Sequence, residues 1–163
     1  MSHARILAVL FSGLLMFSAA CAVTPVEPAH IYIVRHAEKL AGDDPALSEA
    51  GKARARALAG LLAERGVTRI FSTDTLRTRS TAAPLAARLG VPVEIYDHKT
   101  PVELAEQVRD SGESVLIVGH SNTIAGLAAA FGADAGPEVR DDEYDRLYDI
   151  ALAEPVRVDI RCY

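Results

Sequence analysis

The chain has 163 residues, of which 50% are hydrophobic and 24% are charged, with a formal net charge of −5. This length predicts one domain with a substantial core, and an acidic chain without a basic tail or stripe argues against nucleic acid as the main partner. Any site for an anionic ligand must therefore be a local cluster of arginines.

The first residues have the layout of an export signal. A short basic start precedes an apolar run at residues 6–17, and small residues then lead to Cys21. The run is too short for a membrane-spanning helix, which needs roughly 20 apolar residues. We predict a signal peptide over residues 1–20, a tether over residues 21–29 and one domain over residues 30–163.

The cleavage site can be read in two ways. Residues 18–21 resemble, in part, a bacterial lipoprotein lipobox, whose cysteine is lipidated. Ordinary cleavage after a small-x-small triplet is the alternative. We favour lipidation of Cys21, which predicts an exported protein of the periplasm or cell envelope that contacts the membrane only through this lipid. Cys162 would then be a free thiol, since two cysteines make no disulfide framework.

Short β-branched runs alternate with longer Ala- and Leu-rich segments after the leader. Pro84 should kink or restart the helix that contains it. The alternation predicts an α/β fold with three layers, α/β/α, around a mainly parallel sheet. In chain order, we expect a strand at 31–34, a helix at 48–64, a strand at 69–72, a helix at 76–89, an edge strand at 91–95, a helix at 101–109, a strand at 115–118, a helix at 122–131, and closing strands at 147–150 and 156–160.

Three segments with chemically active side chains follow predicted strands. They are residues 35–39, 72–77 and 119–123. Ligands of open parallel sheets bind at the carboxyl ends of the strands, so we expect these segments to meet at one edge of the sheet. At that edge, two histidines and two arginines would lie close together, namely Arg35, His36, Arg77 and His120.

This set of side chains suits phosphoryl chemistry. The planar guanidinium group of arginine matches pairs of phosphate oxygens, and a neutral histidine such as His36 is a competent nucleophile. The backbone N–H groups of Ser121, Asn122 and Thr123 begin a predicted helix, and the start of a helix also favours an anion. A single histidine beside a strand is more often structural, so only the complete set points to catalysis.

Four blocks in the same order resemble the histidine phosphatase superfamily, the phosphoglycerate mutase-like group. They are residues 31–38, similar to the Arg-His-Gly signature, and residues 47–51, 71–82 and 115–121. The resemblance implies a small, single-domain, exported member of this group. It implies that His36 is phosphorylated during turnover, and that Arg35, Arg77, His120, Ser121 and Asn122 bind the phosphorylated substrate.

Several features depart from the family pattern. Ala37 replaces the usual glycine after the nucleophile, and Gly42 stands where many members have an asparagine. The carboxylate that usually protonates the leaving group has no clear counterpart. Asp97 is the nearest candidate, with Glu103 behind it, and Glu143 could fold over the pocket from the C-terminal part of the chain.

We expect a phosphomonoester hydrolase that acts through a phosphohistidine and needs neither a metal nor another cofactor. Its partner would be a small phosphorylated molecule or a phosphoprotein. Two alternatives stay open, a non-catalytic envelope lipoprotein that binds phosphorylated ligands and a phosphoglycerate mutase-type phosphotransferase. The mutase is disfavoured because the chain is short and carries an export signal.

Overall fold

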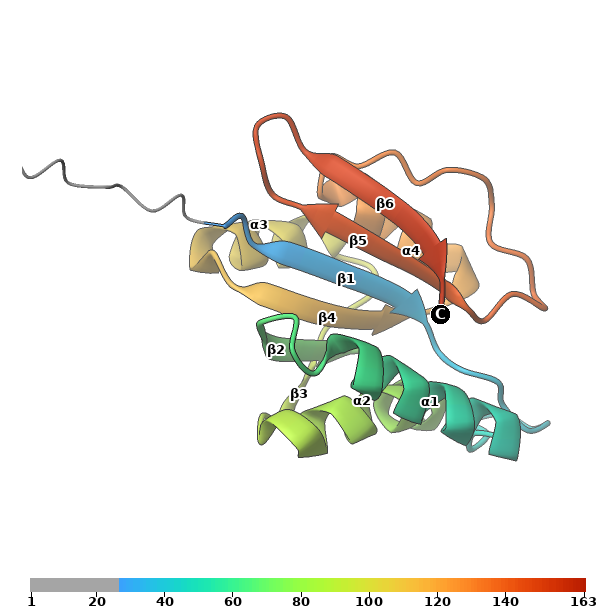
Figure 1. Ribbon diagram of the computed structural model, residues 1–163. Coiled ribbons are helices and arrows are strands. Elements are labelled where there is room, and N and C mark those ends of the chain that lie inside the picture. The colour runs from blue at the N-terminus through green and yellow to red at the C-terminus, as the bar shows by residue number, and fades with distance from the viewer. Residues whose placement is uncertain (1–26) are drawn as a thin grey trace, which may run out of the picture.

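The computed structural model describes residues 27–163, and within them six strands form one sheet that four helices flank (Figure 1). The predicted leader and Cys21 lie outside the described residues. Within the described part of the chain, no helix has the length and apolar character needed to cross a membrane. The elements are β1 (His30–Arg35), α1 (Glu49–Leu62), β2 (Val67–Ser72), α2 (Leu76–Leu89), β3 (Val93–Ile95), α3 (Pro101–Ser111), β4 (Ser114–Gly119), α4 (Ser121–Ala130), β5 (Arg146–Ala151) and β6 (Arg157–Cys162).

The strands follow the order β3-β2-β4-β1-β5-β6 across the sheet. The first four in this order are parallel, whereas β5 runs antiparallel to β1 and β6 antiparallel to β5. The α/β fold with a mainly parallel sheet is therefore confirmed. The short strand β3 lies at an edge, as expected for a segment next to Pro92, whose nitrogen cannot donate a hydrogen bond to a neighbouring strand.

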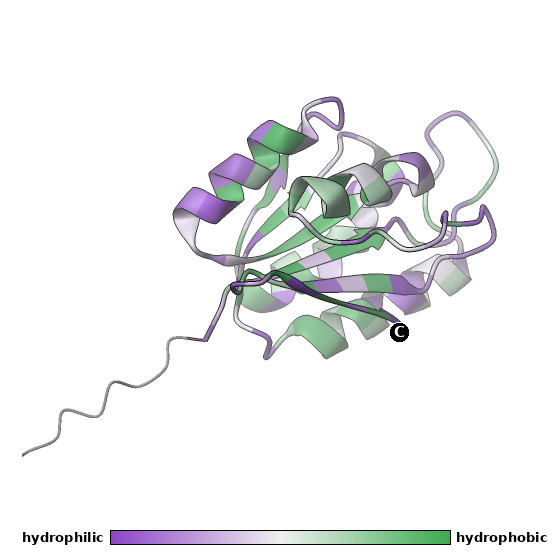
Figure 2. Ribbon diagram, turned by 90° about the horizontal axis from the view of Figure 1, so that it is seen from above, coloured by the Kyte–Doolittle hydropathy of each residue, from purple (hydrophilic) through white to green (hydrophobic). Residues whose placement is uncertain are grey.

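Each face of the sheet is covered by one pair of helices, because successive strand residues point to opposite faces. Ile31, Ile33 and Ile117 belong to the core cluster that includes α3 and α4. Tyr32 and Leu116, the neighbours of these residues, belong to the cluster that includes α1 and α2. Figure 2 shows the apolar strands between helices whose outer faces are polar. Burial on both faces explains why the central strands are continuous apolar runs.

The helix boundaries agree with the predicted ones to within about two residues, the usual scatter between definitions. The side chain of Ser48 caps α1 by accepting a hydrogen bond from the N–H of Gly51, at 3.1 Å. Of the two effects expected of Pro84, a restart does not occur, because α2 runs through it as one helix. Leu85 and Ala86, buried in the core beside Pro84, hold the helix against the sheet despite the missing N–H.

Gly51, in the first turn of α1, packs against the backbone of Glu38 in the loop that follows β1. A Cβ atom at Gly51 would lie 2.0 Å from the carbonyl oxygen of Glu38. We therefore expect Gly51→Ala to lower the free energy of unfolding by about 2 kcal/mol or more. Gly60 in the same helix has open space around it, so Gly60→Ala should raise this free energy by about 0.5–1 kcal/mol. Urea unfolding of both variants tests the contrast, and equal effects would contradict it.

Candidate active site

The three predicted segments meet at one edge of the sheet, because β2, β4 and β1 are parallel neighbours. Backbone hydrogen bonds join the loops directly after the strands. The N–H of His36 donates to the carbonyl oxygen of Gly119 at 2.9 Å, and that of Thr73 to Val118 at 3.4 Å. The N–H of Ala37 donates to the hydroxyl of Thr81 at 3.0 Å. The loops that carry the candidate residues are thus tied to the sheet and to α2.

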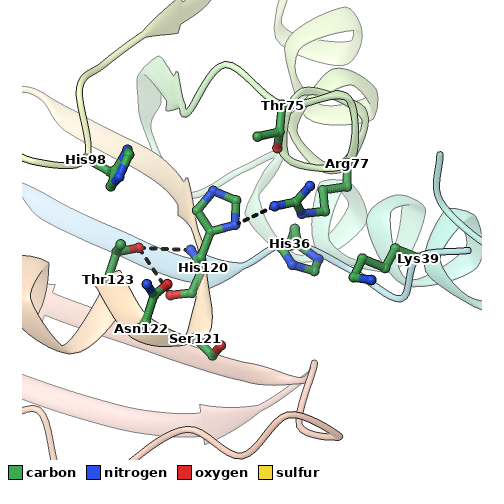
Figure 3. Close-up of a pocket in the computed structure, with 9 residues that line it drawn as sticks. All are labelled: His36, Lys39, Thr75, Arg77, His98, His120, Ser121, Asn122 and Thr123. Carbon is green, nitrogen blue, oxygen red and sulfur yellow. Dashed lines mark hydrogen bonds between the residues drawn. The ribbon is translucent and has the colours of Figure 1, made fainter. Parts of the chain in front are cut away.

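A cavity of about 400 Å³ opens at this edge (Figure 3). It collects side chains from the loop after β1, the start of α2, the segment between β3 and α3, and the start of α4. Five predicted site residues line it, together with four residues whose side chains were not predicted to bind or act on the substrate. The predicted ones are His36, Arg77, His120, Ser121 and Asn122, and the added ones are Lys39, Thr75, His98 and Thr123.

His36 is held as a neutral, oriented imidazole. The residue is 3% exposed, and its Nδ1 lies 2.8 Å from the carbonyl oxygen of Ala37. A carbonyl can only accept, so Nδ1 carries the hydrogen and Nε2 keeps its lone pair. Burial, helped by the positive charges of Arg35 and Arg77, lowers the pKa of His36 to about 4. At neutral pH the side chain therefore has an unprotonated Nε2 that can attack an electrophile.

The low pKa of His36 has a consequence for stability. Between pH 6.5 and about 4 the unfolded chain binds a proton at this residue that the folded chain does not. The free energy of unfolding should therefore fall as the pH drops through this range, by up to about 1.4 kcal/mol per pH unit for this group. The variant His36→Gln should show a shallower fall. Urea unfolding at several pH values tests this, and identical slopes for both proteins would contradict it.

His120 is fixed in the opposite tautomer to His36. Its Nδ1 lies 3.5 Å from the Nη2 of Arg77, a long contact in which only the guanidinium can donate. Its Nε2 therefore carries the hydrogen and donates to the hydroxyl of Thr73, at 2.9 Å. Burial first, then Arg77, lowers the pKa of His120 to about 4. The rings of His36 and His120 lie edge to face with their centroids 5.5 Å apart.

Arg77 brings a cation to the cavity from the first turn of α2. The carboxylate of Asp44 lies 3.5 Å from its Nη1 and also accepts from the N–H of Leu76, at 2.9 Å. The Nε of Arg77 is buried and has no hydrogen-bond partner among the described residues. A buried guanidinium with a spare donor is the arrangement expected where an anion binds.

The guanidinium of Arg35 contacts the segment that precedes β5. Its Nη1 donates to the carbonyl oxygens of Arg140, Asp141 and Glu143, at 2.9, 2.9 and 3.1 Å. Its guanidinium lies 4.3 Å from the ring centroid of Tyr144. Arg35 does not line the cavity. Arg35 fastens the segment before β5 to the end of β1. Contact between Arg35 and a phosphoryl group stays a prediction. Its Nε could make that contact, since it has no hydrogen-bond partner among the described residues.

None of the candidate acids Asp97, Glu103 and Glu143 is among the residues that line the cavity. The carboxylate of Asp97 accepts from the N–H of Lys99 at 2.9 Å, and the residue lines a neighbouring cavity of about 390 Å³. Glu143 instead pairs with Arg146, at 2.5 and 2.9 Å. His98, which the sequence analysis had not placed in the site, lines the cavity of His36. Its position directly after the third strand was the signal that could have included it.

Two further features bear on the predicted site. Gly42 has a φ of +128°, a conformation that residues with a side chain rarely adopt, so an asparagine at this position would require a different loop. Among the described residues, no three His, Cys, Asp or Glu side chains lie close enough together to hold a metal ion.

Residues 31–98 match the family model of the histidine phosphatase superfamily, branch 1. Over this segment the chain is similar to that superfamily. The match includes His36, Arg77 and His98, whereas His120 follows it along the chain. A search of the curated proteins finds no match to the chain.

Several solved structures have the same fold as this chain. A protein from Agrobacterium tumefaciens named for the phosphohistidine phosphatase SixA is 24% identical, with a TM-score of 0.67 over 83% of this chain and 99% of its own. A mycobacterial glucosyl-3-phosphoglycerate phosphatase is 17% identical, with a TM-score of 0.66 over 81% and 97%. A protein histidine phosphatase SixA in complex with tungstate is 18% identical, with a TM-score of 0.65 over 82% and 96%.

Proposed function

We propose that the protein hydrolyses phosphomonoesters through a phosphohistidine formed on His36. The observation that carries this proposal is the state of His36, which is neutral, buried, and held by Ala37 so that Nε2 is free beside Arg77. Two kinds of phosphatase among the proteins of the same fold, together with the superfamily match, support it.

The first step is an in-line displacement. Nε2 of His36 attacks phosphorus, the ester P–O bond breaks, and the leaving alcohol takes a proton. The imidazole becomes a cation when it is phosphorylated, and the carbonyl oxygen of Ala37 stabilises it through the Nδ1–H. Arg77 and the start of α4 offset the charge on the equatorial oxygens. An oxygen near Nδ1 of His120 would also favour protonation of that nitrogen, which would then donate to it.

The second step releases phosphate. Water attacks the phosphorus of the phosphohistidine, the P–N bond breaks, and His36 returns to its neutral form. The cationic side chains Arg77 and Lys39 line the cavity without a carboxylate among its described lining residues. This positive charge suits a phosphoryl group, whether a small molecule or a protein carries it. We therefore propose the reacting group and no particular substrate. The predicted export and lipidation on Cys21 complete the proposal, which places the enzyme in the periplasm or cell envelope.

Phosphate release from a panel of compounds in EDTA tests this function. The panel should contain an aryl phosphate, a sugar phosphate, a nucleotide and a phosphohistidine compound, each incubated with the purified protein. We expect release from at least one compound, undiminished by EDTA. Vanadate that raises the melting temperature without any release would instead favour the phosphate-binding alternative. Phosphate transferred between two substrates would favour the phosphotransferase.

A further inference from the structure

His98 lies at the mouth of the cavity in a well-defined turn. The N–H of Thr100 donates to the carbonyl oxygen of Asp97 at 3.1 Å, and the N–H of Tyr96 donates to Ser72 at 3.1 Å, so both ends of the segment are fixed. The ring of His98 approaches His120 edge to face, with the centroids 6.5 Å apart. Its side chain is 48% exposed and borders the same cavity as His36.

Few of the described lining residues can give a proton to a leaving group. His36 uses its N–H on the carbonyl of Ala37, and the N–H of His120 is donated to Thr73. A proton gained at Nδ1 of His120 would be held by an equatorial phosphoryl oxygen and not by the leaving group. Arginine stays protonated at all relevant pH values, and a lysine with its ordinary pKa of about 10.4 is a weak general acid at neutral pH. The ordinary pKa of histidine, about 6.5, is close to the value that best suits a general acid.

His98 also lies on the appropriate side of the site. In an in-line displacement the leaving oxygen departs on the side of phosphorus opposite the nucleophile. Figure 3 shows His36 and His98 on opposite sides of the His120 ring. A phosphoryl group bound beside His120 and attacked from His36 would therefore direct its leaving group toward His98.

We propose that His98 is the general acid that protonates the leaving group, an inference that rests on the proposed function. Protonated His98 transfers its proton to the ester oxygen as the P–O bond breaks, and becomes neutral. Neutral His98 then accepts a proton from the water that attacks the phosphohistidine, which restores the starting state. The carboxylate of Asp97 lies 3.9 Å from Nδ1 of His98. Asp74, Tyr96 and His120 are the other titratable residues that border the adjoining cavity with His98.

The dependence of the rate on the leaving group tests this role. An alkoxide is a poor leaving group and needs a proton, whereas a dinitrophenolate does not. We expect His98→Gln to reduce kcat/KM for an alkyl phosphate, which reports formation of the phosphohistidine, about 100-fold or more. For 2,4-dinitrophenyl phosphate the loss of kcat/KM should be at most a few-fold, and the alkaline fall in kcat/KM for the alkyl ester should disappear. Asp97→Asn is the matched control. Its effect on the alkyl-phosphate rate should be smaller than that of His98→Gln. Adding Asp97→Asn to His98→Gln should cause no further loss.

Three outcomes would overturn the inference. Equal losses for both esters would make His98 a binding residue, and an unchanged alkyl-phosphate rate would remove it from the mechanism. The acid would be Asp97 if Asp97→Asn lowered the alkyl-phosphate rate more than the dinitrophenyl-phosphate rate, both alone and in combination with His98→Gln. Wild-type protein that releases phosphate from neither ester would overturn the proposed function itself, and the inference with it.

Discussion

Replacing His36 with alanine should reduce phosphate release about 10⁴-fold or more, the scale seen when a covalent nucleophile is removed. The reason is that the neighbouring His120 is not free to replace it, since both of its nitrogens are engaged, with Arg77 and Thr73. The measurement is kcat/KM on the best substrate of the panel, together with trapping of the phosphoenzyme. The wild-type label should be stable in alkali and labile in acid, and His36→Ala should carry none.

His30 offers a matched control for this substitution. It begins β1, the strand that His36 follows, and its Nδ1 lies 2.5 Å from a carboxylate oxygen of Asp149, at the opposite end of the strand from the cavity. His30→Gln should therefore keep the label and the rate. A His36→Ala protein that folds, as judged by its circular dichroism, and still forms an alkali-stable label would show that another residue is the nucleophile.

Arg77→Ala should weaken vanadate binding about 100-fold, since hydrogen bonds to a charged group contribute about 1.5–3 kcal/mol. Arg77 borders the cavity with a buried Nε that has no partner among the described residues. The value of kcat/KM should fall at least as far, because the charge on the phosphoryl oxygens also has to be stabilised during transfer. Arg77→Lys should recover only part of the loss, since lysine keeps the charge but not the planar fork.

Arg79 provides the control for Arg77 in the same helix. It lies two residues further along α2 and forms an ion pair with Asp74 at the surface. Arg79→Ala removes the same charge from the chain, so it should leave vanadate affinity and turnover nearly unchanged. Equal weakening by both substitutions would mean that net charge, rather than a built anion site, determines binding. Melting temperatures separate this effect from unfolding, because Arg77 also contacts Asp44 and His120.

Much of the fold could be predicted from local pattern. The apolar runs of β1, β2 and β4 are buried on both faces, so each reads as a strand without knowledge of its neighbours. Because parallel strands place their carboxyl ends at one edge, the same pattern predicted that His36, Arg77 and His120 would meet. The cavity that these three line agrees with that expectation.

Other features depend on residues that are far apart in the sequence. The environment of Arg35 is set by carbonyl groups more than 100 residues further along the chain, which no local pattern reveals. His98 and Asp97 are adjacent in sequence, yet only His98 borders the cavity of His36, because the turn directs the Asp97 carboxylate to the N–H of Lys99.

The sequence by itself determined the order of the elements, the edge of the sheet that carries the site, and three of its central residues, because these follow from periodicity and strand direction. Only the tertiary structure decided the chemical state of the site. The neutral forms of His36 and His120 result from burial, and their opposite tautomers result from contacts with Ala37, Thr73 and Arg77. Burial and hydrogen-bond partners are properties of the packed chain, so they arise only when distant segments come together.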